Sequence, residues 1–377
     1  MASSSYNNGY GDQKRQTGQE DRLSLLPDVL LLDILSYIDT KIVVQCSVLS
    51  KRWLTVWTKL SVFNFDFSLY KVNQTYAKDS SFDTFVNNVL ACRNKSIKID
   101  SINIKVIDYS TMALVFDHAL WFGVPNVSID TSRNPSGEHK FSCFNYNDSL
   151  TNFSLKGPLD FGQLPKFNGL VSLHLERVNL VVSEPFSCFP NLEKLSLVNC
   201  RVVSSEIRVI GYRLSKLTIS SVCYYPENFL LLTPELVLLE LDGPVPMSLK
   251  AAFDELPSLE SVYIDYSYPL NGFQLDHTLI KTFRCLKNAK HVHLSTSTLK
   301  LLYKARDMLA EERCLFWNLK YLNFIPKPNE PVDQQVLESV LAYLCEDSPQ
   351  AVVDTMHRWL NSTSLTAIVF QCQCVTT

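Results

Sequence analysis

Two pairs of residues in the chain have types and a spacing that could bind a metal ion. His291 and His293 are two residues apart, so on a strand both imidazoles would lie on one face, and Cys372 and Cys374 repeat this spacing near the C-terminus. A structural zinc site needs four ligands, and neither pair has further ligands at a matching spacing. We therefore predict no metal site and no cofactor, and we assign the cysteine pair to a final strand, LTAIVFQCQCV, at 365–375.

The sequence also contains none of the common catalytic motifs that we searched for. G-x-x-x-x-G-K-[ST], G-x-G-x-x-G, H-E-x-x-H and G-x-S-x-G do not occur. Only 11 of the 377 residues are glycine, which disfavours a phosphate-binding glycine loop. No nucleophile, base and acid stand out as a set. We therefore predict that the protein is not an enzyme and has no catalytic residues.

Composition limits the class of protein further. Hydrophobic residues make up 46% of the chain and charged residues 19%, so a large core can form. The net charge of −3 disfavours a nucleic-acid partner. Residues 1–21 form a polar tail without a signal peptide, and no apolar run is long enough to span a membrane. The eleven scattered cysteines suit free thiols in a reducing compartment, so we expect the nucleus and/or the cytoplasm.

The elements that must position any binding residues begin with three short helices in 22–62. The first runs from near Pro27 to about Tyr37, a second is capped by Asp39, and a third spans Ser47 to Leu60. On the first helix, Leu30, Leu31, Ile34, Leu35 and Ile38 share one stripe at 100° per residue, while Val29 and Leu32 lie opposite. A helix with two apolar faces must be covered from two directions, so we expect a partner.

The segment DRLSLLPDVLLLDILSYIDTKIVVQCSVLSKRWLTVWTKL closely resembles a plant-type F-box. The resemblance rests on LPD at Leu26–Asp28, the aliphatic helix after it, and SVLSKRW at Ser47–Trp53. It implies docking on the Skp-family adaptor of a cullin–RING ubiquitin ligase, which would cover the second face. Many relatives have proline in place of Asp39 and an acidic residue in place of Val29. The adaptor-binding residues that it implies are Leu26, Pro27, Leu30, Ile34, Val48, Leu49, Lys51, Arg52 and Trp53.

Beyond the F-box the sequence is periodic. The apolar pattern L-x-x-L-x-L recurs ten times at intervals of 20 to 30 residues, with first positions Ile99, Val124, Leu150, Leu170, Leu192, Leu214, Leu236, Leu259, Ala289 and Leu319. Such periods are typical of leucine-rich repeats. We predict an α/β solenoid in which a small three-helix F-box precedes a leucine-rich-repeat horseshoe with parallel strands on its concave face. Longer intervals carry convex helices, for example Thr298 to Glu312.

The expected domain boundaries follow from these patterns. After the F-box at 22–62 we expect a linker or helical cap at 63–95 and leucine-rich repeats at 96–330. Residues 331–377 would close the array with C-terminal helices and the terminal strand. Cys200 occupies the repeat position that takes Asn or Cys, so we expect a buried structural thiol.

Alternate residues of each repeat strand point out of the core and define a concave surface. On this surface we predict a target-binding site at Glu240, Asp242, Tyr263 and Asp265, where carboxylates surround an aromatic ring. An ordinary solvated strand face is the alternative. No arginine cluster supports the recognition of a phosphorylated segment.

Two functions from different classes fit these features. The first is a substrate receptor of an SCF-type ligase, which docks on the adaptor, and through it on the cullin and RING subunits, and presents a target protein for ubiquitination. The second is a repeat scaffold without a ligase role, in which the F-box-like helices only cap the solenoid. A third reading, a small-molecule co-receptor, would need a pocket in the concave face.

Overall fold

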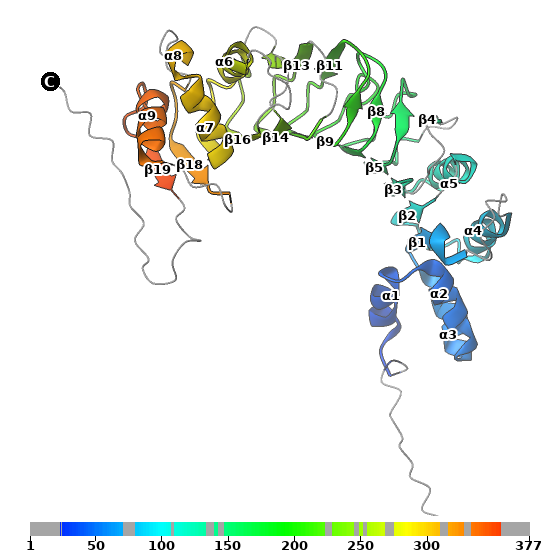
Figure 1. Cartoon of the computed structure of the whole chain (residues 1–377). Coiled ribbons are helices and arrows are strands. Elements are labelled where there is room, and N and C mark those ends of the chain that lie inside the picture. The colour runs from blue at the N-terminus through cyan, green and yellow to red at the C-terminus, as the bar shows by residue number, and fades with distance from the viewer. Residues whose placement is uncertain are drawn as a thin grey trace, which may run out of the picture.

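The computed structural model describes Leu23 and residues 25–70, 80–106, 109–132, 139–141, 147–222, 228–244, 249–251, 255–267, 275–309, 316–327 and 333–355. Three short helices are followed by a curved solenoid, and Figure 1 shows the helices at one end of the arc. The predicted final strand at 365–375 lies outside the described residues. Among the described residues, no helix combines the length and the apolar character needed to cross a bilayer.

The N-terminal helices are α1 (Asp28–Ser36), α2 (Thr40–Gln45) and α3 (Lys51–Val56). Asp39 caps α2 as predicted, because its side chain accepts a hydrogen bond from the Lys41 amide at 2.8 Å. The single third helix predicted from Ser47 to Leu60 is wrong. The extended backbone of Ser50 (φ −164°) interrupts it, so α3 lies between the 3-10 turns η1 (Cys46–Val48) and η2 (Trp57–Lys59).

A twelve-stranded parallel sheet runs the whole length of the solenoid, in the order β1-β2-β3-β5-β7-β9-β12-β14-β16-β17-β18-β19. Each of the ten predicted repeats begins two residues before one of its strands, so the predicted register is confirmed. These strands are β2 (Ser101–Lys105), β3 (Asn126–Asp130), β5 (Asn152–Lys156), β7 (Ser172–Glu176), β9 (Lys194–Val198), β12 (Lys216–Ser220), β14 (Leu238–Pro244), β16 (Ser261–Ser267), β17 (His291–Ser295) and β18 (Tyr321–Ile325).

The sheet has one further strand at each end. β1 (Val62–Asp66) pairs with β2, and β19 (Val352–Thr355) pairs with β18. The segment predicted as a linker or helical cap, 63–95, contains most of β1, the 3-10 turn η3 (Phe67–Tyr70) and helix α4 (Ser80–Cys92). The repeat strand β1 was not predicted there. Phenylalanine occupies the second and third apolar positions of the β1 repeat. A search centred on leucine therefore did not find this repeat.

The outer side of the solenoid changes along the chain. It carries α4 and α5 (Tyr109–Trp121) near the N-terminus and α6 (Leu275–Cys285), α7 (Thr296–Lys304), α8 (Arg306–Leu309) and α9 (Gln334–Leu344) near the C-terminus. The middle repeats have short strands instead: β4 (His139–Phe141), β6 (Leu159–Phe161), β8 (Asn179–Leu180) and β10 (Arg201–Val202) form one sheet, and β11 (Glu206–Ile210), β13 (Asn228–Leu232) and β15 (Leu249–Ala251) another. The convex helix predicted from Thr298 to Glu312 is present as two helices, α7 and α8, and its predicted end at Glu312 lies outside the described residues.

The repeat positions predicted to be buried form the core. Leu195 and Leu197 are 1% and 0% exposed in the middle of the array. Cys200 is also buried, and its thiol donates a hydrogen bond to the Leu175 carbonyl at 3.3 Å. Burial raises the pKa of the Cys200 thiol to about 11, which keeps it protonated at neutral pH. The predicted structural role of this cysteine is consistent with that environment.

Tight turns lead the chain out of the concave strands. Gly157 and Gly243 have positive φ angles of 131° and 111°, and Arg177, Asn199 and Ser221 take the same place in the repeats between them with φ of 50° to 58°. The amides of Gly157 and Arg177 donate to the last carbonyl of the next strand, at 2.9 Å in both cases. These bonds fasten consecutive repeats to each other.

Candidate adaptor-docking and target-binding surfaces

Helix α1 has a buried and an exposed apolar face. Leu31 and Leu35 are buried and Leu32 packs against the core, whereas Leu30 and Ile34 are exposed by 49% and 42%. The predicted stripe that joined Leu30 and Ile34 to Leu31 and Leu35 is therefore wrong, and so is the outward placement of Leu32. The second apolar face does exist, but it consists of Val29, Leu30 and Ile34.

More apolar side chains are exposed nearby in the same small domain. Val48 at the end of η1 and Leu49 just after it are 86% and 65% exposed, and Leu25 and Leu54 are exposed as well. Exposed apolar residues in such a number indicate an interaction surface rather than scattered surface side chains. We call Val29, Leu30, Ile34, Val48 and Leu49 the docking residues.

Other predicted adaptor-binding residues hold the helices together. Arg52 donates to Asp28 Oδ1 from Nε at 3.0 Å and from Nη2 at 2.8 Å, and it also donates to the Leu26 carbonyl. Lys59 Nζ approaches Asp28 Oδ2 at 3.1 Å. Hydrogen bonds from Arg52 and then Lys59 lower the pKa of Asp28. Trp53 is only 7% exposed.

The nine predicted adaptor-binding residues thus differ in how exposed their side chains are. Pro27, Leu30, Ile34, Val48, Leu49 and Lys51 are exposed, Leu26 and Arg52 are half-buried, and Trp53 is buried. The exposed members can meet a partner directly, while Arg52 and Trp53 position the helices that carry them. Adaptor binding by any of these side chains stays a prediction.

Asp39 joins the helical unit to the sheet. Besides capping α2, its Oδ2 atom accepts a hydrogen bond from the Asp66 amide of β1 at 2.9 Å. Thr40 Oγ1 accepts another from the Asn64 amide at 2.9 Å, and the Asn64 side-chain amide donates to the Ser36 carbonyl at 2.6 Å. The departure from the F-box proline at this position therefore has a structural role.

The predicted target-binding residues come together on the concave face. In the ladder between β14 and β16, Glu240 lies opposite Tyr263, and Asp242 lies opposite Asp265. The pKa of Tyr263 is raised by burial and then by Asp265, Asp242 and Glu240, so all three carboxylates act on this ring. Sequence periodicity alone had placed these four side chains on one surface.

Lysines partly neutralise that surface. Lys216 Nζ lies 2.8 Å from Glu240 Oε1, and Lys327 Nζ lies 2.6 Å from Asp265 Oδ1. Burial alone would raise the pKa of Glu240, but hydrogen bonds from Lys216 and Thr218 lower it overall. The Ser220 hydroxyl donates to Asp242 Oδ2 at 2.7 Å. The surface is therefore less acidic than three unpaired carboxylates would make it.

Aromatic and imidazole rings extend this surface toward the C-terminus. His293 lies opposite Tyr263 in the ladder, and His291 lies opposite Tyr321. The Tyr321 ring centroid is 6.3 Å from that of each histidine, and the Tyr321 hydroxyl donates to Asp354 Oδ2 at 2.9 Å. Sequence reasoning listed the two histidines but missed Tyr321, although it lies two residues after Leu319, at the same repeat position as His291.

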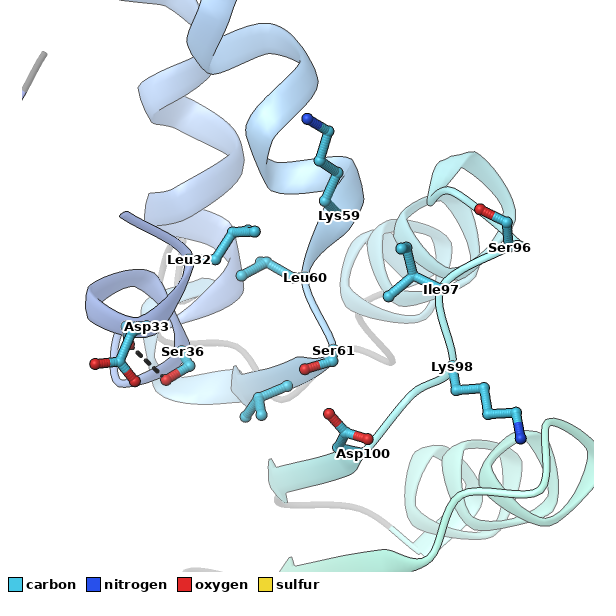
Figure 2. Close-up of a pocket in the computed structure, with 11 residues that line it drawn as sticks. Leu32, Asp33, Ser36, Lys59, Leu60, Ser61, Ser96, Ile97, Lys98 and Asp100 are labelled. Atoms are coloured by element: carbon cyan, nitrogen blue, oxygen red, sulfur yellow. Dashed lines mark hydrogen bonds between the residues drawn. The ribbon is translucent and has the colours of Figure 1, made fainter. Parts of the chain in front are cut away.

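Two hollows adjoin these surfaces. One of about 560 Å³ lies between the helical unit and the first repeat, where Leu32, Leu60 and Ile97 meet Asp100. Figure 2 shows that the ammonium groups of Lys59 and Lys98 point away from it. A shallower hollow of about 190 Å³ lies on the concave face over β2, β3, β5 and β7. Within the described part of the chain, no three His, Cys, Asp or Glu side chains gather as metal ligands.

Comparison with known proteins identifies both parts of the chain. The family model of the F-box domain matches residues 23–65. F-box/LRR-repeat protein At1g06630 of Arabidopsis thaliana is 29% identical over 316 residues, covering 78% of this chain and 72% of that protein. F-box/FBD/LRR-repeat protein At2g04230 of Arabidopsis thaliana is 26% identical, and the match covers 81% of this chain and 72% of that protein. F-box/LRR-repeat protein At3g26922 of the same species is 25% identical, and the match covers 76% of this chain and 94% of that protein. The chain therefore contains an F-box domain and is homologous over most of its length to F-box/LRR-repeat proteins of Arabidopsis.

Proposed function

We propose that the protein is a non-catalytic substrate receptor of an SCF-type cullin–RING ubiquitin ligase. The F-box docks on a Skp-family adaptor, and the leucine-rich repeats present a target protein for ubiquitination in the nucleus or cytoplasm. The observation that carries this proposal is the set of docking residues, which stay exposed on a domain that matches the F-box family. An adaptor surface that covers them removes apolar area from water.

The contribution of such a receptor to the reaction is positional. Holding the target and the adaptor in one complex raises the effective concentration of a target lysine near the ubiquitin-charged enzyme. The continuous sheet from β1 to β19 suits this task, because each strand is hydrogen-bonded to its neighbours. The other subunits of the ligase carry the ubiquitin chemistry.

Co-purification with a plant Skp-family adaptor tests the docking step. The variant is the full chain with Leu30→Glu and Leu49→Glu, and the matched control is Val203→Glu with Tyr212→Glu, two exposed residues of the solenoid. We expect the first variant to lose the adaptor and the control to keep it, with unchanged circular dichroism in both. Undiminished adaptor recovery with the Leu30 and Leu49 variant would contradict the proposal.

A repeat scaffold without a ligase role is the second candidate. The hydrogen bonds from β1 to Asp39 and Thr40 favour it, because they show that the helices also cap the first strand of the sheet. In that case the helices would stabilise the solenoid without binding an adaptor. The same co-purification separates the two candidates, since a pure cap recovers no adaptor even in the wild-type chain.

A further inference from the structure

A group of four rings lies on the concave face near the C-terminus. Tyr263 comes from β16, His291 and His293 from β17, and Tyr321 from β18, and these three strands are neighbours in the sheet. Three of the rings are half-buried and His291 is exposed, so all four present surface to the concave side. We call Tyr263, His291, His293 and Tyr321 the ring patch.

Carboxylates border the ring patch on both sides. At one end of the ring patch, Asp242 and Asp265 lie opposite each other in the ladder between β14 and β16. At the other end, Asp354 accepts the hydrogen bond of the Tyr321 hydroxyl. Lys216 and Lys327 are bound to Glu240 and Asp265. Among the described residues, neither Asp242 nor Asp354 has a basic nitrogen within 4.0 Å of its carboxylate. The border therefore retains negative charge.

The concave face of the first repeats has a different character. Ser101, Asn103, Asn126, Ser128, Asn152 and Ser154 line it. Several of these side chains bond to one another, for example Asn152 Nδ2 to Asn126 Oδ1 at 2.6 Å. Hydroxyl and amide groups have no preference for a charged partner. His174 also lines this part and lies close to Glu176, but among the described residues tyrosine rings occur on the concave strands only in the C-terminal part.

We propose that the ring patch binds a lysine or arginine side chain in an extended basic segment of the target protein. Ring faces attract a cation through their quadrupole, and the bordering carboxylates complement its charge. Aromatic side chains that are half-buried on a rigid strand also lose little conformational freedom on binding. This inference rests on the proposed receptor function and specifies the target's chemistry.

His293 makes this binding sensitive to pH. Burial, followed by the nearby His291, lowers the pKa of His293. This lowered pKa keeps the His293 imidazole uncharged at neutral pH, and the imidazole repels a bound cation only when acidification charges it. The charged or titratable groups around the patch are Lys216, Glu240, Asp242, Glu260, Tyr263, Asp265, Lys290, His291, His293, Lys320, Tyr321, Lys327 and Asp354.

Fluorescence anisotropy with the full chain tests the proposal. The probe is a labelled short peptide of alternating lysine and glycine, and the comparison peptide has glutamine in place of lysine. We expect at least about tenfold tighter binding of the lysine peptide. Tyr263→Ala with Tyr321→Ala should abolish this preference, and Asp242→Asn with Asp354→Asn, which keeps the side-chain shapes, should weaken it about three- to tenfold. The control, Ser128→Ala with Ser154→Ala, changes the other half of the concave face and should bind as the wild type does.

Equal binding of the two peptides, or wild-type affinity in both patch variants, would overturn the proposal. Tighter binding of an RNA oligonucleotide at the same residues would also overturn it. Acidification from about pH 7.5 to about pH 5 should weaken the binding of the lysine peptide, and His293→Gln should reduce that dependence. The patch variants should still co-purify with the adaptor, so a failure here is distinct from a failure of the receptor function.

Discussion

The F-box and the solenoid differ in how far their large apolar side chains are exposed. Of the seventeen large apolar side chains that are exposed in the described residues, eleven lie between Leu23 and Leu69, and only six are spread over the rest of the chain. A repeat array buries its leucines between neighbouring repeats, whereas a domain of about forty residues cannot enclose both faces of its first helix. Apolar residues therefore supply stability in the solenoid and interaction surface in the F-box.

The largest expected effect is on the solenoid core. Leu195→Ala should lower the free energy of unfolding by about 2–5 kcal/mol, because it leaves a cavity at a position that is 1% exposed. Lys194→Ala, one residue away and exposed on the concave face of the same strand, should change the free energy of unfolding by less than about 0.5 kcal/mol. Denaturant unfolding of the two variants measures the difference. Equal destabilisation would mean that burial does not distinguish these neighbours.

The turns between repeats should give the next largest effect. At Gly157 an added Cβ atom would lie 2.0 Å from Thr131 Oγ1, and the φ of 131° is strained for any other residue. Gly157→Ala should therefore destabilise the solenoid by about 1–3 kcal/mol in the same unfolding experiment. Arg177→Gly, at the same position of the next repeat, should stay within about 1 kcal/mol of the wild type. An unchanged free energy of unfolding for Gly157→Ala would contradict this account of the turn.

In the F-box a leucine substitution should leave stability almost unchanged. Leu49→Ala removes a side chain that is 65% exposed, so the free energy of unfolding should shift by less than about 0.5 kcal/mol. The affinity for a Skp-family adaptor should nevertheless fall about tenfold or more, which surface plasmon resonance can measure. A loss of stability as large as that of Leu195→Ala would erase the distinction between the two regions.

The smallest effect concerns the ion pairs of the F-box. Hydrogen bonds from Arg52 and Lys59 lower the pKa of Asp28 below its ordinary value of 3.8. The stabilisation is thus complete above about pH 4 and is lost as the pH falls through the lower folded-state pKa. The difference in melting temperature between the wild type and Asp28→Asn should be constant from pH 7 to about pH 5 and should shrink below about pH 4. A difference in melting temperature that grows as the pH falls would contradict the lowered pKa of Asp28.

Sequence periodicity predicted the solenoid well because the repeat fixes both the strand and its register. Ten of the twelve strands, from β2 to β18, were identified by the apolar position two residues before them, including β17 and β18 after the longer intervals. The prediction failed at β1, where Phe63 and Phe65 replace leucine. On α1 it also failed to identify the buried face, because a helix with apolar residues all round has no distinguishing stripe.

The candidate sites show a similar division. The grouping of Glu240 with Tyr263 follows from repeat spacing, and so does the approach of Lys216 to Glu240 from the preceding strand. The pairing of Asp265 with Lys327 does not, because Lys327 lies beyond the end of β18 and enters through the loop geometry. Local sequence likewise gave no sign that Arg52 would bind Asp28 across 24 residues.

The hydrogen bonds that tie the F-box to β1 have a consequence for the proposed receptor function. Because Asp39 and Thr40 hold β1, and β1 is the first strand of the long sheet, no flexible joint separates the docking helices from the repeats. Eight strand steps separate β1 from β16, or roughly 40 Å at about 4.8 Å per step. If the protein is the substrate receptor that we propose, the number of repeats sets the distance between the adaptor and the target. Removing one repeat would bring a bound target about one strand width closer to the adaptor and rotate it. A different set of its lysines would then face the ubiquitin-charged enzyme.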